Sequence, residues 1–271
     1  MSERISNARM YAVTAQVEDA WRTLLAQVAR EAAVPLKYLP YPAPQPLETL
    51  WSRPDLGAVF MCGYPIALKL APVVPLAAPI PRAPWAQGRA IYRTDLIVRA
   101  DAPYRALEDT FGGRAGWTVS HSQSGFNALR HHLLAYREAG RPALYREMQG
   151  NLVTARNVLD AVRAGRIDIG PLDAYWHLLI ARHAPELCAG VRVLTSTALT
   201  PLPALVASAG TPAEAVTRLR TALTGAASRP WFAPLGQQLL IEGFVEVEPD
   251  AYGIFLDWDA QARAAGFPEP A

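Results

Sequence analysis

An α/β fold with largely parallel sheets is predicted from three features of the chain. Residues 9–13 have the pattern of a short strand, and a helix with apolar residues on one face follows directly. Residues 56–62 form a continuous apolar run, as expected for a strand buried on both faces of a parallel sheet. Residues 167–173 end in a turn that leads into another helix. Strands that alternate with helices in this way are typical of α/β proteins.

The first part of the chain supplies further elements. Thr14 is placed to cap the first helix through its hydroxyl group. The proline-rich segment 72–81 is predicted to be an edge strand, because proline lacks the N–H group that a central strand needs. The other elements expected in this part are a short helix at 47–51 and strands at 36–41 and 90–100.

The remaining residues continue the alternation. A helix at 155–164 is predicted to end at Gly165, a residue type that often follows the last helical turn. The tail from Gly266 is expected to be loose. The strands expected in this part are 117–119, 145–148, 191–195 and 202–208. The helices expected are 127–136, 174–182, 211–223, 231–240 and 249–264.

The composition excludes several classes of protein. With 51% hydrophobic and 18% charged residues, the chain is expected to be ordered and globular. Its 271 residues suit one large domain or two small ones. A net charge of +2, with no basic run, argues against a nucleic-acid partner. The two cysteines, Cys62 and Cys188, lack metal-ligand spacing and are expected to be buried and unbridged.

Two features bear on the membrane and the compartment. The longest apolar tract, 56–80, is interrupted by Lys69 and four prolines, so it is not expected to span a membrane. The first residues of the sequence show no apolar stretch with a cleavage site. As written, the sequence therefore favours a cytoplasmic protein, and the alternative is an exported protein whose signal has been removed.

The polar turn at 120–125 is the strongest candidate for a ligand site. It runs from a predicted strand into a predicted helix, whose first backbone N–H groups lack partners within the helix and favour an anion. The hydroxyl groups of Ser122 and Ser124 and the amide of Gln123 add donors, and Gly125 permits close approach. His121 binds an anion when protonated. The alternative is that one serine only caps the helix.

Four segments in a fixed order resemble a known family. They are AIYRTDLIVRAD at 90–101, LEDTFGGR at 107–114, SQSG at 122–125 and VRAGRIDIGPLD at 162–173. Together they resemble the phosphate/phosphonate-binding proteins of ABC transporters, which have the type 2 periplasmic-binding-protein fold. The resemblance implies two lobes, each with a mostly parallel sheet flanked by helices, joined by two crossing strands. Lobe one would comprise 1–95 and 203–271, and lobe two 96–202.

The resemblance implies that the ligand lies between the lobes and contacts lobe one at the ends of strands. It implicates Thr14, which has capping as its alternative role. It also implicates Gly63 and Tyr64, although Tyr64 would equally suit packing within the lobe. On the first crossing strand, Tyr92 and Thr94 match the Tyr-x-Ser segment of the family, and Arg93 between them adds a cation.

Lobe two departs from the family pattern at one position. The family carries a histidine that contacts the ligand at the start of the helix that ends at Gly165, where this chain has Ala155. Arg156 is the neighbouring candidate to replace that donor. Asp173 matches an acidic residue of the family that binds a ligand amine or hydroxyl, and capping of the following helix is its alternative role.

These features predict a solute-binding protein that closes on a small, anionic, phosphate/phosphonate-like ligand, with an ABC transporter permease as the implied partner. No catalytic residue, metal or cofactor is predicted, because the chain lacks the Walker, His-Glu-x-x-His and Cys-x-x-Cys motifs. The alternative is a cytoplasmic enzyme on the same fold, similar to those of menaquinone or thiamine biosynthesis. A third possibility is a cytoplasmic sensor domain. The identity of the ligand and the oligomeric state are left open by the sequence.

Overall fold

Two units of the α/β class are present in the computed structural model, which describes residues 3–137 and 143–270. Unit 1 comprises Met1–Tyr92 and Pro201–Gly253, and unit 2 comprises Arg93–Thr200 and Ile254–Ala271. The backbone therefore passes from one unit to the other after Tyr92, after Thr200 and again after Gly253. The prediction placed residues 254–271 in lobe one, whereas their contacts group them with unit 2.

The sheet of unit 1 has six strands in the order β13-β4-β12-β3-β1-β2. Strand β1 pairs in parallel with β2 and β3, whereas the pairs β12–β3, β12–β4 and β13–β4 are antiparallel. The sheet is therefore mixed, not mostly parallel as predicted. Its strands are β1 (Arg4–Asn7), β2 (Leu36–Tyr38), β3 (Leu56–Met61), β4 (Val73–Pro81), β12 (Ala204–Ser208) and β13 (Ile241–Glu246).

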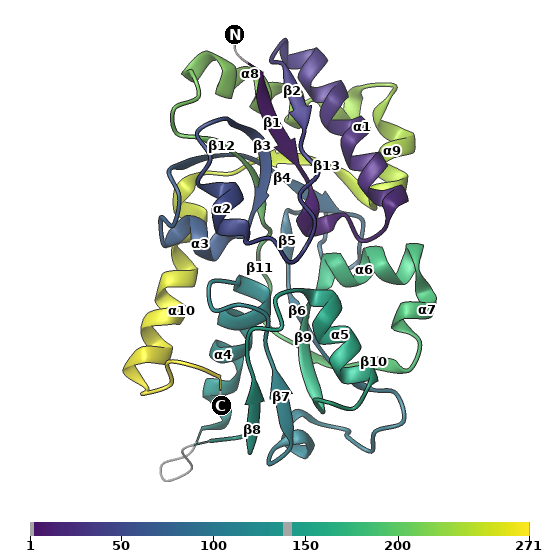
Figure 1. Ribbon diagram of the computed structural model, residues 1–271, viewed down its shortest axis with the longest axis vertical. Helices are drawn as coiled ribbons and strands as arrows, with labels where there is room; N and C mark the ends of the chain where they lie inside the picture. Colours follow the sequence, from purple (N-terminus) through teal and green to yellow (C-terminus); the bar gives the residue numbers. More distant parts are fainter. Residues whose placement is uncertain (1–2, 138–142, 271) are drawn as a thin grey trace. The chain divides into compact units, whose positions relative to one another are not determined.

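The helices of unit 1 pack around this sheet. Helix α1 contacts both α8 and α9, and the three lie together in Figure 1. The Trp21 side chain of α1 is fully buried and meets the Phe60 ring of β3 edge to face, with ring centroids 5.0 Å apart. The helices are α1 (Ala15–Ala32), α2 (Leu47–Trp51), α3 (Gly63–Ala67), α8 (Ala213–Thr224) and α9 (Phe232–Leu239).

Strand β4 is central, which contradicts the prediction of an edge strand. It lies between β13 and β12 despite its prolines. The pairing of β4 with β12 shifts register beside Val206, the partner of Pro75. The pairing of β4 with β13 shifts register beside Ile241, the partner of Pro81. Irregularities of this kind are where a sheet tolerates proline, because the missing N–H group falls at a break in the ladder. The carbonyl of Pro75 is also bound by the Arg220 guanidinium, at 2.8 Å.

Unit 2 has a five-stranded sheet in the order β10-β6-β9-β7-β8. Strand β7 is parallel to β8 and β9, whereas β6 is antiparallel to β9 and β10, so this sheet is mixed as well. The predicted strand 117–119 is instead β7, three residues earlier in the chain. The strands are β6 (Thr94–Arg99), β7 (Arg114–Gly116), β8 (Glu147–Gln149), β9 (Ile169–Asp173) and β10 (Val191–Ser196).

A continuous helical segment follows the polar turn of unit 2. It starts with a π-helical turn, Gln123–Asn127, and so begins four residues before the predicted helix at 127–136. Helix α4 continues it. The helices of this unit are α4 (Ala128–Leu133), α5 (Ala155–Arg163), α6 (Ala174–His183), α7 (Pro185–Cys188) and α10 (Gly253–Ala264).

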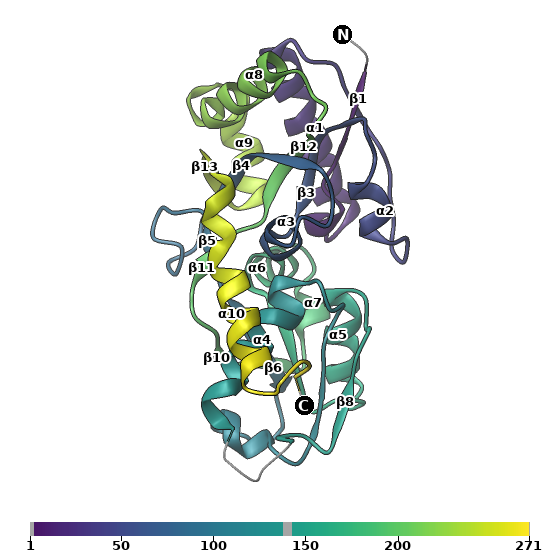
Figure 2. The same cartoon turned by 90° about the vertical axis from the view of Figure 1, so that its left-hand side faces the viewer.

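The C-terminal residues pack onto unit 2. Helix α10 lies alongside α4 (Figure 2), and the rings of His131 and Trp258 are stacked 4.2 Å apart. Phe267, beyond the end of α10, is only 2% exposed and belongs to the same core cluster as Leu133. The prediction of a loose tail from Gly266 was therefore wrong up to the end of the described residues.

Two short strands mark the first two passages of the backbone. Strands β5 (Ile91–Tyr92) and β11 (Thr200–Pro201) pair with each other as a separate two-stranded sheet. The predicted strand 90–100 is divided into β5 and β6 at Arg93, whose carbonyl accepts a hydrogen bond from the backbone N–H of Ala174 at 3.0 Å. That bond ties the start of β6 to the start of α6.

Candidate ligand-binding site

Three helical segments of unit 2 begin where parallel strands end. The helix from Gln123 follows β7, α5 follows β8, and α6 begins directly after β9. The first N–H groups of a helix have no intrahelical partner and carry partial positive charge. In open α/β sheets the carboxyl ends of the strands are also where ligands bind. This end of the sheet is therefore suited to an anion.

The polar turn, residues 120–125, is partly a helix cap. The Ser122 hydroxyl oxygen accepts a hydrogen bond from the Gly125 N–H at 3.0 Å, so Ser122 is the N-cap. The capping role considered for one of the serines is thus confirmed. Gln123, Ser124 and Gly125, expected in a loop, form the buried first turn of the helix. Ser122 keeps a hydroxyl proton to donate, because capping uses only its oxygen as acceptor.

Thr94 connects this turn to the sheet. Its hydroxyl donates to the Ser124 carbonyl at 3.1 Å, and its N–H donates to the Thr197 hydroxyl at 3.0 Å. Thr94 also pairs with Asp173 across β6 and β9. Three of the predicted residues, Thr94, Ser124 and Asp173, are therefore brought together within unit 2.

Asp173 caps helix α6. Its Oδ1 accepts hydrogen bonds from the N–H groups of Tyr175, at 2.8 Å, and Trp176, at 3.0 Å. Burial and the negative charge of Asp173 raise the pKa of the Tyr175 phenol well above its ordinary value, so this hydroxyl stays neutral. The capping role weighed for Asp173 is confirmed. A ligand contact by the same carboxylate remains a prediction.

Gly125 is explained by a close contact inside unit 2. A Cβ atom at this position would lie 2.0 Å from the Thr118 hydroxyl oxygen. The Thr118 N–H donates to the Gly125 carbonyl at 3.2 Å, which holds the two backbones together. Glycine is therefore required here by the fold of the turn, whether or not a ligand approaches.

Sequence reasoning missed two polar residues beside the turn. Thr118 is buried, and its hydroxyl has no hydrogen-bond partner in the described part of the chain. Asn127 is fully buried and donates to the Gln123 side-chain oxygen at 2.9 Å. The spacing of four residues between Gln123 and Asn127 places both on one helical face and could have indicated this pair.

Of the remaining predicted residues of unit 2, only His121 lies in the turn. His121 is half-buried within it. Arg93 is directed to Asp95, with its Nε 3.3 Å from a carboxylate oxygen. Arg156 is exposed and pairs with Asp160 one helical turn away, at 2.9 Å. The role of Arg156 as a substitute for the family histidine stays a prediction.

Four predicted residues lie in unit 1 and are described within it. Thr14 caps α1, since its hydroxyl oxygen accepts from the Val17 N–H at 3.2 Å. Gly63 and Tyr64 open α3 after strand β3 ends, and Tyr64 is buried. Tyr92 is buried at the end of β5. Their predicted contacts with a ligand stay predictions.

The fold and the turn define a solute-binding protein of the type 2 periplasmic kind. Residues 12–252 match the family model described as ABC transporter, phosphonate, periplasmic substrate-binding protein. The chain belongs to this family, which confirms the resemblance seen in its motifs. This membership favours the solute-binding role over the enzyme alternative. A search of curated proteins finds no match.

Solved structures confirm the two-lobed α/β fold. A binding protein component of an ABC phosphonate transporter from Pseudomonas aeruginosa has a TM-score of 0.82 at 14% identity, with 97% of this chain and 87% of that chain covered. PhnD1 from Prochlorococcus marinus, in complex with methylphosphonate, has a TM-score of 0.78 at 12% identity, covering 96% and 98%. A Xanthomonas citri protein bound to ATP has a TM-score of 0.68 at 19% identity, covering 98% of each chain.

Family membership also bears on partners and compartment. The family is periplasmic and supplies substrate to an ABC transporter, so a ligand and a transporter permease are its implied partners. Among the described residues, every helix is too short or too polar to cross a bilayer.

Proposed function

We propose that this protein binds a small oxyanion of the phosphonate or phosphate-ester class and delivers it to an ABC transporter permease. The observation that supports the proposal most directly is the gathering of three helix starts at one end of the unit 2 sheet. Each has N–H groups without intrahelical partners, and the caps Ser122, Thr154 and Asp173 accept hydrogen bonds from only some of them. The Ser122 and Ser124 hydroxyl groups add neutral donors in the same turn.

The ligand class is proposed from this donor set together with the family. Neutral N–H and O–H donors bind tetrahedral oxyanions through several hydrogen bonds that are strengthened by the charge of the anion. One of the structural neighbours holds methylphosphonate and another holds ATP. Both ligands carry oxygens on phosphorus, so simple phosphonates and nucleotide phosphates are the two groups of candidates to test.

Lobe closure is part of the proposal. In this class of protein a ligand stabilises the closed form by contacting both lobes. The proposed contributors from unit 1 are Thr14, Gly63, Tyr64 and Tyr92. Arg93, the residue after Tyr92, is the proposed cation. Replacing each of these residues in turn and measuring the affinity for the ligand by calorimetry tests its contribution.

Thermal unfolding of the full chain tests the proposal. Methylphosphonate, inorganic phosphate, ATP, a sulfonate and a carboxylate are added separately at several concentrations. A ligand present at a hundred times its Kd stabilises the folded state by about 2.7 kcal/mol, which raises the Tm by several degrees. If none of these compounds raises the Tm, and native mass spectrometry of the purified protein finds no bound anion, the proposal is wrong.

Cell fractionation tests the compartment. The cytoplasmic location predicted from the sequence requires the full-length gene product to remain with the cytoplasmic fraction, whereas the family is periplasmic.

A further inference from the structure

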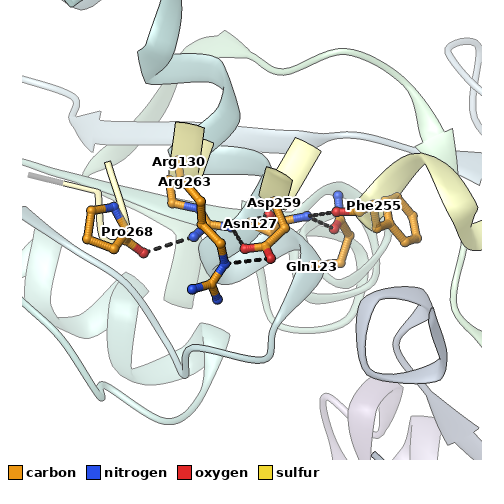
Figure 3. Close-up of polar contacts among 7 residues, drawn as sticks. All are labelled: Gln123, Asn127, Arg130, Phe255, Asp259, Arg263 and Pro268. Atoms are coloured by element: carbon orange, nitrogen blue, oxygen red, sulfur yellow. Dashed lines mark hydrogen bonds and ion pairs between the residues drawn. The ribbon is translucent and has the colours of Figure 1, made fainter. Parts of the chain in front are cut away.

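A chain of hydrogen bonds connects helix α10 to the polar turn (Figure 3). It begins at Asp259 of α10, whose carboxylate pairs with the Arg130 guanidinium of α4. The Arg130 side chain is only 1% exposed, and it also donates to the Pro268 carbonyl at 2.8 Å. From Arg130 the chain continues to the Asn127 side-chain oxygen, again at 2.8 Å. A buried arginine held by a carboxylate has little freedom to move.

Two partners determine how the Asn127 amide is oriented. Arginine is only a donor, so the Asn127 atom that faces Arg130 has to be the oxygen. The other end of the amide donates to the Phe255 carbonyl at 3.1 Å, and a carbonyl is only an acceptor. Both partners therefore require the same orientation, in which Nδ2 points away from Arg130.

The orientation of Asn127 determines that of Gln123. The Asn127 Nδ2 also donates to the Gln123 Oε1 at 2.9 Å, so Gln123 presents its oxygen to Asn127. The other end of the Gln123 side-chain amide, Nε2, therefore points away from Asn127. Gln123 is fully buried, and this nitrogen has no hydrogen-bond partner among the described residues. A buried donor without an acceptor is costly, and its presence beside a candidate site indicates a missing acceptor.

We propose that Asp259, Arg130 and Asn127 are positioning residues, which hold Gln123 so that its Nε2 donates to an oxygen of the bound oxyanion. This inference rests on the proposed function and specifies its ligand further. At this position the ligand has to present an acceptor oxygen, as a phosphonate, phosphate ester or sulfonate does. An ammonium or amide N–H group of a ligand would meet a donor here and be rejected.

Nuclear magnetic resonance tests the donor directly. The side-chain NH2 signals of Gln123 are assigned in the full chain by their loss in Gln123→Leu. Methylphosphonate is then titrated into the wild-type protein. We expect the Gln123 side-chain signals to shift along with the backbone amides of residues 122–125. If those backbone amides shift to saturation while the Gln123 NH2 signals stay in place, the inference is overturned and the proposed function stands.

The role of Asn127 is tested with Asn127→Asp. This change keeps the shape and the oxygen that faces Arg130 but removes the donor to Gln123, and with it the donor to the Phe255 carbonyl. The Gln123 amide should then turn its NH2 group to the new carboxylate and present its oxygen to the ligand. We expect affinity for methylphosphonate to fall at least tenfold by calorimetry, which matches the loss of about one charge-assisted hydrogen bond.

A double-mutant cycle separates positioning from a general effect on structure. If Asn127 acts through Gln123, adding Asn127→Asp to Gln123→Leu lowers affinity no further. If the two losses add in full, the inference is overturned. Arg263→Ala is the matched control, because Arg263 also binds Asp259, at 2.8 Å, but is exposed and lies outside the chain to Gln123. Its affinity for methylphosphonate should equal that of the wild type.

The remaining outcomes distinguish the two levels of the proposal. If the wild-type protein binds none of the phosphorus oxyanions, the proposed function and this inference both fail. If it binds methylphosphonate and Asn127→Asp binds it equally well, only the inference fails. Unfolding curves recorded for each variant establish that the folded state is retained at the temperature of the measurement.

Discussion

Thr94 donates its hydroxyl proton to the backbone carbonyl of Ser124, 3.1 Å away, and so joins the first strand of unit 2 to the polar turn. Thr94 is 1% exposed, and it is separated from Ser124 by thirty residues of sequence. The family resemblance suggested Thr94 because of its hydroxyl group. The structure shows that this hydroxyl positions the turn.

Thr94→Val is therefore expected to affect both stability and binding. The change keeps the shape of the side chain but removes the donor to Ser124, which should lower the free energy of unfolding by about 1–2 kcal/mol. Affinity for methylphosphonate should fall as the turn loosens. Denaturant unfolding and calorimetry measure the two effects. Thr94→Ser, which keeps the hydroxyl, should restore most of both, and equal losses in the two variants would contradict this role.

Gly125→Ala tests the close contact of the turn with Thr118. The added methyl group would lie 2.0 Å from the Thr118 hydroxyl oxygen and 2.9 Å from its Cβ, so one of the two backbones has to shift. Overpacking of this kind costs about 1–3 kcal/mol. Denaturant unfolding should show this loss in the single variant. Adding Thr118→Ala should recover part of it, and strictly additive losses would argue against the clash.

The stability of unit 2 should depend on pH through His177. Its Nδ1 lies 2.9 Å from the Asp95 carboxylate, which also accepts from the Ser196 hydroxyl at 2.8 Å. Burial alone lowers the pKa of His177, but hydrogen bonds with Asp95 and Cys188 outweigh it and raise the pKa from 6.5 to about 9. The prediction that Cys188 is buried was wrong, because this residue is partly exposed.

A raised pKa means that folding favours the protonated imidazole. The resulting stabilisation is complete below pH 6.5 and is lost as the pH rises through about 9. The loss should reach roughly 3 kcal/mol at most, since one pKa unit corresponds to about 1.4 kcal/mol. Chemical denaturation from pH 6 to pH 9.5 measures it. In His177→Gln this part of the pH dependence should be absent, and an unchanged profile would rule out His177 as its source.

The sequence patterns predicted most elements better than their places in the sheets. The strand predicted at 9–13 was wrong, because Arg9–Tyr11 is a short 3-10 helix and β1 lies earlier, at Arg4–Asn7. The buried strand at 56–62 and the helices at 47–51 and 155–164 were located within one residue, because each has a clear apolar period or a clear boundary residue. Strand β4 was misplaced at an edge, because the register shifts that accommodate its prolines involve β12 and β13, which lie far away in sequence.

Only part of the site could be predicted, for a similar reason. The polar turn carries a local signal, with serines and a glycine between a strand and a helix, so its capping role could be anticipated. Within the chain from Asp259 through Arg130 to Asn127, only the last two residues carry a local signal, because they lie three residues apart on one helix. Asp259 has no such signal, since it reaches Arg130 only when α10 packs on α4. Residues 254–271 were expected in lobe one for the same reason. Their apolar pattern predicts a helix but does not specify which hydrophobic core that helix joins.

Phe267→Ala tests whether the residues after α10 stabilise unit 2. The Phe267 ring is 2% exposed and lies under the Arg137 guanidinium, whose carbon is 4.7 Å from the ring centre. Truncating a buried phenylalanine costs about 3–5 kcal/mol, and a position near the chain end should fall at the low end of that range.

Leu256→Ala is the matched control, because Leu256 lies on α10 itself but is 39% exposed. It should change the free energy of unfolding by less than about 0.5 kcal/mol. Urea unfolding followed by tryptophan fluorescence measures the stability of both variants. Trp258 of α10 is a suitable reporter because its ring stacks on His131 of α4. If Phe267→Ala unfolds at the same urea concentration as the wild type, the C-terminal residues do not contribute to the core of unit 2. In that case their packing would not hold Asp259 beside Arg130.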